Sequence, residues 1–420
     1  MRESFLAAYR CIDDVYRKKS FSGVGLNKIL SGLSPSDKPL TAKLVYGVID
    51  KSIFLTYIIR QYAKTVKPSV LPILQIGAYC LYFLSIPDAV AVNESVELAK
   101  AAGKGGAGGF VNAVLKNIAK NKTDIRYPSD KIQRLSVLYS YPQWAVRRLI
   151  EDYGEETAGQ IISFEPKSDF YHIRNNPYIL TRAELEKQLD GNGVEYKKSD
   201  GGFFVKGALD GVDKKAFVIQ SLSSIFVCMA SGVKKGDRIL DLCAAPGGKS
   251  VFCAQLGAEV TACDIHPHRV SLIEKYAASL NVKLAARLND ATVFNKEFEN
   301  AFDIVLCDVP CSGFGVVSSK PDIKLFKTDA AISSLAQTQK KILETACRYV
   351  RRGGRLVYST CTLFKAENGD VVNEFLSAHG NFAVEEICLD YPKTKEGYLQ
   401  FLPHRDGTDG FFIALLKREY

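Results

Sequence analysis

The sequence has 420 residues, 47% of them hydrophobic, and at ~150 residues per domain this length predicts two or three folded units that each bury a core. The formal charge of +9, from 55 basic and 46 acidic residues, suits a polyanionic partner such as RNA and is equally compatible with an ordinary basic protein. Eleven scattered cysteines without a CxxC pair, beside only five histidines, argue against a zinc site or a disulfide framework and favour reduced thiols in the cytoplasm.

Residues 1–125 are predicted to form an all-α bundle. Apolar side chains recur there at three-and-four spacing, as in Leu44, Val45, Val48 and Ile49. The most apolar stretch, residues 71–86, is interrupted by Pro72 and Gln75 and is shorter than the ~20 residues of a membrane span, so we expect a buried helix. Residues 1–10 lack the apolar core of a signal peptide, and we expect none.

The rest of the chain divides into two predicted parts. Residues 126–212 combine a helical linker with a small α/β subdomain, in which strands at 171–174 and 203–206 flank a helix at 182–189. From residue 213 to 420, strands are predicted at 238–243, 259–263, 284–288, 302–307, 355–359 and 411–416, with helices at 249–256, 267–280 and 332–350. This alternation predicts a mostly parallel sheet with helices on both faces, which is a Rossmann-like α/β domain.

A glycine turn follows the first predicted strand of that domain. The segment DLCAAPGGKS at 241–250 runs from strand to turn to helix, and Gly247 and Gly248 let the backbone approach a ligand closely. A Walker A phosphate loop would need glycine where Cys243 stands, and the GxGxxG pattern of a dinucleotide fold is absent. A methyltransferase loop, whose cofactor carries a sulfonium and no phosphate, is the interpretation that remains.

Two carboxylates follow the next two predicted strands. Asp264 ends the second strand, ~20 residues past the glycines, where a carboxylate commonly accepts hydrogen bonds from the ribose hydroxyls. Asp290 ends the third strand, beside the expected place of an adenine. Each alone is as compatible with a solvated or capping residue, but the two in register after the glycine turn favour a cofactor site.

Two cysteines follow the fourth and fifth predicted strands. One lies in DVPCSGFG at 308–315 and the other in Thr360-Cys361-Thr362. Carbon 5 of cytosine is too poor a nucleophile to accept a methyl group directly, but addition of a thiolate to carbon 6 makes an enamine that can. A carboxylic acid at ring nitrogen 3 would assist this addition, and Asp308 is the candidate.

These motifs resemble those of a known family along nearly the whole chain. The stretches DLCAAPGGKS (241–250), DVPCSGFG (308–315), KPDIK (320–324), STCTLFKAEN (359–368) and DGTDGFF (406–412) are together highly specific. They resemble the RsmB (Sun) group of bacterial rRNA cytosine-5 methyltransferases within the NOL1/NOP2/Sun family. The stretches LVYG (44–47), AVNESVELAK (91–100) and FVNAVL (110–115) resemble a NusB-like RNA-binding helical domain.

The resemblance implies an S-adenosyl-L-methionine-dependent enzyme that methylates carbon 5 of a specific cytidine in 16S rRNA. Cys361 is the implied nucleophile, which bonds to carbon 6, and Cys311 assists product release. The implied cofactor residues are Cys243, Ala244, Ala245, Pro246, Gly247, Gly248 and Lys249, with Asp264, Asp290 and Asp308. One departure is Ser221, which stands where the family often has an aspartate and cannot supply its charge.

RNA contacts are expected just past the catalytic loop. A paired base is out of reach of Cys361, so the target must be unpaired or flipped out. Lys320, Lys324 and Lys327 are the predicted phosphate contacts, with a solvated lysine-bearing loop as the alternative.

Three other functions are compatible with parts of the sequence. A non-enzymatic NusB-type RNA-binding protein would have a damaged glycine turn or would lack Cys361, and both are intact. A tRNA target stays open, although the helical N-terminal domain favours rRNA. A DNA cytosine methyltransferase is disfavoured because its nucleophile belongs to a Pro-Cys element, whereas here a Thr-Cys element is also present. We therefore expect a cytoplasmic protein with rRNA as its partner, without a metal ion and without a membrane association.

Overall fold

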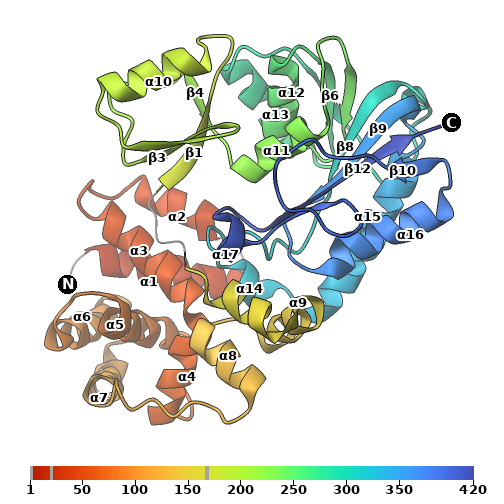
Figure 1. The fold of residues 1–420 in the computed structure, drawn as a ribbon. Coiled ribbons are helices and arrows are strands. Elements are labelled where there is room, and N and C mark those ends of the chain that lie inside the picture. Colours follow the sequence, from red (N-terminus) through yellow and green to blue (C-terminus); the bar gives the residue numbers. More distant parts are fainter. Residues whose placement is uncertain (1–2, 19–21, 166–169) are drawn as a thin grey trace. The chain divides into compact units, whose positions relative to one another are not determined.

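The computed structural model describes residues 3–18, 22–165 and 170–420 (Figure 1). Two compact units comprise Met1–Ser163 with Val317–Thr328, and Phe164–Val316 with Asp329–Tyr420. The chain therefore leaves the second unit after Val316, adds a short segment to the first unit, and returns.

The first unit is a helical bundle, as predicted. Its helices are α1 (Glu3–Lys18), α2 (Ser22–Leu30), α3 (Lys38–Asp50), α4 (Ser52–Tyr62), α5 (Leu71–Phe83), α6 (Asp88–Ala101), the short η1 (Gly105–Ala107), α7 (Gly108–Lys120), α8 (Lys131–Tyr139), α9 (Gln143–Ser163) and α14 (Ile323–Phe326). Their apolar stripes meet in one core, which includes Ile12, Leu44, Ile58, Leu74 and Leu115. The apolar stretch at 71–86 is a buried helix, α5, as expected. Among the described helices, none has the length and apolarity that crossing a membrane requires.

The unit boundaries differ from those predicted at residues 125 and 212. Helices α8 and α9 belong to the bundle, because α8 packs on α4 and the Ser140 hydroxyl accepts the Ile53 backbone N–H at 3.0 Å. Leu325 and Phe326 of α14 also pack on the bundle core, although they are distant in sequence. Such contacts depend on long-range packing, which local periodicity does not report.

A small antiparallel sheet opens the second unit. Its strands β1 (Phe170–Asn175), β2 (Tyr196–Ser199), β3 (Gly202–Lys206) and β4 (Phe217–Ile219) lie in the order β2-β3-β1-β4, with α10 (Arg182–Gly191). The helix begins with a capping box between Thr181 and Glu184. Two of the strands and the helix were predicted, whereas β2 and β4, of four and three residues, were not.

A larger sheet follows, in the order β10-β12-β9-β8-β5-β6-β7, with β11 beside β12. Its elements are α11 (Leu222–Ala230), β5 (Arg238–Asp241), α12 (Gly248–Gln255), β6 (Glu259–Asp264), α13 (Pro267–Ser279), β7 (Ala285–Leu288), η2 (Lys296–Phe298), β8 (Phe302–Asp308), α15 (Asp329–Ala346), β9 (Val350–Thr360), η3 (Lys365–Glu367), α16 (Gly369–Ala378), β10 (Phe382–Val384), β11 (Leu399–Phe401), α17 (Pro403–Asp406) and β12 (Phe411–Arg418). Strands β5 to β9 are parallel and β12 is antiparallel to β9. Two separate cores cover its two faces, one with Phe226 and Val251, the other with Ile342 and Phe375. This confirms the predicted Rossmann-like arrangement.

The order of the strands predicts a ligand crevice at the carboxyl edge of the sheet. From β5 the chain proceeds outward through β6 and β7, then crosses back to β8 and β9 on the other side of β5. Ligands of open α/β sheets bind where the direction reverses in this way, outside the strand ends. The loops after β5, β6, β8 and β9 therefore define the candidate site.

Candidate active site

The glycine turn after β5 is shaped by two local features. Gly247 has φ +109°, in the left-handed region that favours glycine, and it precedes the first turn of α12. Its backbone N–H donates to the Ala244 carbonyl at 2.7 Å, which closes the turn through the Ala245–Pro246 peptide. The first N–H groups of α12 follow this turn directly, and the start of a helix offers such groups to a ligand.

Asp241, the last residue of β5, is a site residue that was not predicted as a ligand. Its side chain is fully buried, and its Oδ2 accepts the Ser250 hydroxyl at 2.6 Å. Its Oδ1 is buried and has no hydrogen-bond partner among the described residues. Burial raises the pKa of this carboxyl to about 6. An unpaired buried carboxylate oxygen at a strand end is an acceptor prepared for a ligand, and the position at the end of the first strand was the available signal.

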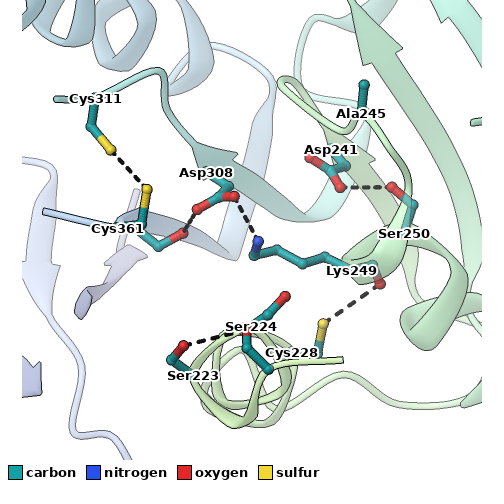
Figure 2. A network of polar contacts seen from close by, with 12 residues as sticks. Ser223, Ser224, Cys228, Asp241, Ala245, Lys249, Ser250, Asp308, Cys311 and Cys361 are labelled. Carbon is teal, nitrogen blue, oxygen red and sulfur yellow. Dashed lines mark hydrogen bonds and ion pairs between the residues drawn. The ribbon is translucent and has the colours of Figure 1, made fainter. Parts of the chain in front are cut away.

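Asp308, at the end of β8, is joined to the glycine turn by an ion pair. Lys249 extends from α12 to Asp308, and the Lys249 Nζ to Asp308 Oδ2 distance is 2.6 Å (Figure 2). The Ser359 hydroxyl donates to the other carboxylate oxygen at 2.8 Å. Burial lowers the pKa of Lys249, but the Asp308 carboxylate outweighs this effect, so the pKa lies above its ordinary value. The ammonium group therefore stays charged and fixes the Asp308 carboxyl.

The two predicted cysteines meet. Cys311 follows β8 and Cys361 follows β9, and their sulfurs face each other at 3.2 Å (Figure 2). They meet because β8 and β9 are parallel neighbours with Asp308 opposite Ser359, so the loops after both strands start side by side. The contact with Cys361, followed by burial, raises the pKa of Cys311 well above its ordinary value. The raised pKa keeps Cys311 as a protonated thiol beside Cys361.

All eleven cysteines are free, and seven of the nine besides Cys311 and Cys361 are buried, so most of these nine are small core residues. No group of three or more metal-ligating side chains occurs in the described part of the chain.

The two cysteine loops are held by backbone contacts. The Gly315 N–H donates to the Cys361 carbonyl at 2.9 Å, and the Gly410 N–H donates to the Gly315 carbonyl at 2.8 Å. A Cβ at Gly315 would lie 1.9 Å from the Gly410 carbonyl oxygen, so only glycine fits. The closing motif at 406–412 thus serves the site by placing Gly410 against the Cys311 loop.

Asp264 and Asp290 lie where the strand pattern placed them. Asp264 ends β6 and is buried, its Oδ1 accepts the His266 N–H at 3.1 Å, and Arg269 lies 3.3 Å from its Oδ2. Asp290, two residues past β7, accepts both the N–H and the hydroxyl of Thr292 through Oδ1, at 2.9 and 2.7 Å. Oδ1 of Asp290 therefore stabilises a turn, which is the alternative role that the sequence left open for this residue. Asp264 stabilises the backbone just after β6.

The predicted phosphate contacts belong to the segment Val317–Thr328 of the first unit. Lys320 is exposed and Lys327 is half-buried. Lys324 corrects the prediction, because its side chain is only 3% exposed and its ammonium group donates to the Asp50 carbonyl at 2.9 Å and pairs with the Asp50 carboxylate. A buried, paired ammonium group is a structural residue and not a phosphate contact. Ser221 is exposed at the start of α11, without a side-chain cap bond.

Comparisons with known proteins identify the family of the chain. The model of the 16S rRNA methyltransferase RsmB/F family matches residues 229–417, and that of the NusB family matches residues 5–120. The chain is 35% identical to the probable ribosomal RNA small subunit methyltransferase B of Bacillus subtilis, over 96% of each chain. The chain belongs to the RsmB/F methyltransferase family. A probable methyltransferase B of a Synechocystis species is 28% identical over 98% of each chain.

Solved structures share the fold of this RsmB/F family member. The crystal structure of PH0851 has a TM-score of 0.83 and 22% identity over 98% of each chain. NSun6 from Pyrococcus horikoshii, solved with SFG, an analogue of S-adenosylmethionine, has a TM-score of 0.59 and 22% identity, over 67% of this chain and 100% of that one. The NusB-like bundle and the S-adenosylmethionine-dependent methyltransferase domain that the sequence predicted are thereby confirmed.

Proposed function

We propose that this protein methylates carbon 5 of a cytidine in small-subunit rRNA, with Cys361 as the covalent nucleophile. The observation that carries the proposal is the pair of thiols, 3.2 Å apart, at the ends of two neighbouring strands. Several relatives carry the name ribosomal RNA small subunit methyltransferase B, which supports the class of substrate.

Cys361 supplies the step that activates the base. Its thiolate adds to carbon 6 of the ring, and the electron pair of the 5,6 double bond makes carbon 5 nucleophilic. S-adenosylmethionine, when bound, supplies an electrophilic methyl group. After methylation, a base accepts the proton on carbon 5, the electron pair of that C–H bond re-forms the 5,6 double bond, and the Cys361 thiolate leaves. The neighbouring Cys311 is the thiol that assists this release.

Asp308 supports the same addition from β8. Lys249 and Ser359 hold its carboxyl in place, and when that carboxyl carries a proton it can hydrogen-bond or protonate ring nitrogen 3 while sulfur adds. The ring nitrogen then carries no full negative charge as the thiolate attacks.

The residues of the crevice suit S-adenosylmethionine. The unpaired Oδ1 of Asp241 is an acceptor for a cationic or hydrogen-bonding group, and Gly247 and Gly248 permit close approach. Asp264 would accept the ribose hydroxyls, and Asp290 would border the adenine. Cys243, Ala244, Ala245, Pro246 and Lys249 complete this predicted set.

The first unit would bring the RNA. A NusB-like bundle and a basic segment with Lys320 and Lys327 are suited to hold phosphates, while the target base is unpaired or flipped out. An rRNA substrate would place the enzyme in the cytoplasm, with the ribosomal subunit or its RNA as partner.

Bisulfite sequencing of rRNA and tRNA, from cells with and without the gene, tests the target. The loss of one methylcytosine in 16S rRNA is the expected result. A loss confined to tRNA would move the target, and no loss anywhere would refute the proposed activity.

Purified variants test the mechanism. Cys361→Ala should lose turnover and covalent capture of RNA that contains 5-fluorocytosine, whereas Cys311→Ala should accumulate an adduct on ordinary RNA. Cys388→Ala, which changes an exposed cysteine outside the site, is the matched control. If Cys361→Ala traps RNA and Cys311→Ala does not, the two roles are reversed.

A further inference from the structure

One buried carboxylate binds the residue that follows each cysteine. Oε1 of Glu367 accepts the backbone N–H of Ser312 at 2.8 Å, and Oε2 accepts the Thr362 hydroxyl at 3.2 Å. The Ser312 and Thr362 hydroxyls also hydrogen-bond to each other at 2.7 Å. Ser312 and Thr362 directly follow Cys311 and Cys361, and adjacent Cα atoms are ~3.8 Å apart. The three hydrogen bonds among Glu367, Ser312 and Thr362 therefore lie one residue away from each cysteine.

The same carboxylate is linked to a third point of the Cys311 loop. The Gln339 amide, on α15, donates both to Glu367 Oε1 at 3.1 Å and to the Pro310 carbonyl at 3.0 Å. Cys311 is thus flanked by two residues, Pro310 and Ser312, that are both fixed by the Glu367 cluster. Glu367, Gln339, Ser312 and Thr362 are each 1% exposed or less, so water does not compete for these hydrogen bonds.

Burial of the Glu367 carboxyl is unfavourable unless hydrogen bonds compensate for the loss of water. Burial raises the pKa of Glu367, while hydrogen bonds from Ser312, Gln339 and Thr362 oppose that rise. Glu367 comes directly before Asn368, whose amide donates to the Thr362 carbonyl at 3.1 Å, and α16 then leads away. A helix start alone would not require a carboxylate aimed back into two loops.

We propose that Glu367 is the positioning residue of the two-cysteine site, which holds the Cys311 and Cys361 loops at the separation that addition and release of the base require. The inference rests on the proposed function. Glu367 acts through Ser312 and Thr362 and does not itself touch the reacting atoms. Its removal should leave the cofactor crevice intact, since Asp241, Gly247 and Asp264 come from other loops.

Kinetics of Glu367→Ala and Glu367→Gln test this role. In steady-state methylation, we expect Glu367→Ala to lower kcat by about 10- to 100-fold, because small displacements of reacting groups reduce the rate by such factors. KM for S-adenosylmethionine should stay within about twofold of the wild-type value. Glu367→Gln keeps an oxygen for the Ser312 N–H, and its amide can donate to Thr362, so it should restore the rate to within about threefold. Glu385→Gln, which alters a partly buried glutamate paired with Arg355, is the matched control.

A measurement without methylation separates this inference from the proposed function. Diamide removes two hydrogen atoms from a pair of adjacent thiols and joins them, and mass spectrometry of peptides reports the Cys311–Cys361 bond. The bond should form at least about tenfold more slowly in Glu367→Ala than in the wild type or Glu367→Gln. If Glu367→Ala does not fold, Thr362→Val removes only the hydroxyl partner and should show the same effects to a smaller extent.

The outcomes are distinct. Wild-type thiol coupling and kcat in Glu367→Ala overturn the positioning role even when the enzyme makes 5-methylcytosine. Equal losses in Glu367→Ala and Glu367→Gln, with thiol coupling unchanged, also overturn it, because they indicate a need for charge. If the wild-type enzyme does not methylate cytosine, the proposed function is wrong. Slowed thiol coupling in Glu367→Ala would still support the positioning role of Glu367.

Discussion

A methyl group added at Gly315 should lower the rate of catalysis and leave the affinity for the cofactor nearly unchanged. The Cβ of Gly315→Ala would lie 1.9 Å from the Gly410 carbonyl oxygen and 2.8 Å from the Cys361 carbonyl oxygen. Non-bonded heavy atoms prefer about 3.5 Å, so one of these backbone segments has to move by more than about 1 Å. Both clashing atoms are backbone, so rotation of a side chain cannot relieve the overlap.

The magnitude follows from what moves. Displacement strains the hydrogen bonds from Gly315 to Cys361 and from Gly410 to Gly315, each worth about 1 kcal/mol, and adds overpacking of about 1–3 kcal/mol. We therefore expect a loss of about 3–5 kcal/mol in the free energy of unfolding if both hydrogen bonds are lost. Because the Cys361 backbone is one of the clashing groups, kcat should fall about 100-fold.

The assays are urea unfolding, single-turnover methylation and calorimetric titration with S-adenosylmethionine. The dissociation constant for S-adenosylmethionine should stay within about threefold of the wild type, because the glycine turn at 247–248 is on another loop. Gly380→Ala is the control, since a Cβ there meets no atom within 4 Å, and its stability should change by less than about 0.5 kcal/mol. Wild-type kcat in Gly315→Ala would refute the reasoning about the loop contact.

Three more predictions concern charges. The pKa of Asp241 is raised to about 6, so the folded state keeps this proton to higher pH than the unfolded state, and the free energy of unfolding should fall by about 3 kcal/mol between about pH 4 and pH 6. Asp241→Asn should lack that part of the pH dependence in urea unfolding, and a difference from the wild type that is constant over this range would contradict the assignment. Lys249→Met should lower kcat by about 10- to 100-fold, because it frees the Asp308 carboxyl. The control Lys340→Met, which breaks a surface pair with Glu374, should not lower kcat. Equal kcat values for the two variants would argue against a role for the Lys249–Asp308 ion pair. Lys324→Met should cost about 1–3 kcal/mol of stability, because it removes the buried partner of Asp50 while Lys51 still lies 3.3 Å from that carboxylate, and it should keep the salt dependence of RNA binding. Lys320→Met should keep stability and reduce the slope of log affinity against log salt by about 1. The reverse pattern in filter binding would restore Lys324 as a phosphate contact.

Features that depend on short stretches of chain were predictable. Three-and-four spacing predicted the helices of the first unit, and alternation of apolar runs with amphipathic stretches predicted β5 to β9. Because parallel neighbouring strands end at one edge, the residues at their carboxyl ends, including Asp308 and Cys361, were expected to converge. The short strands β2, β4, β10 and β11 were not predicted, whereas β5 and β7, which have four residues each, were predicted because they alternate with amphipathic helices.

The sequence by itself determined the fold class, the glycine turn and the two thiols, because each depends on residues close together in the chain or on the common edge of a parallel sheet. Only the tertiary structure decided what surrounds them. Glu367 and Gly410 reach the Cys311 loop from more than 50 and nearly 100 residues away, and Lys324 is buried against Asp50 across 274 residues. Such partners are selected by the packing of distant segments and by the need to satisfy buried polar groups, and neither is encoded in a local pattern.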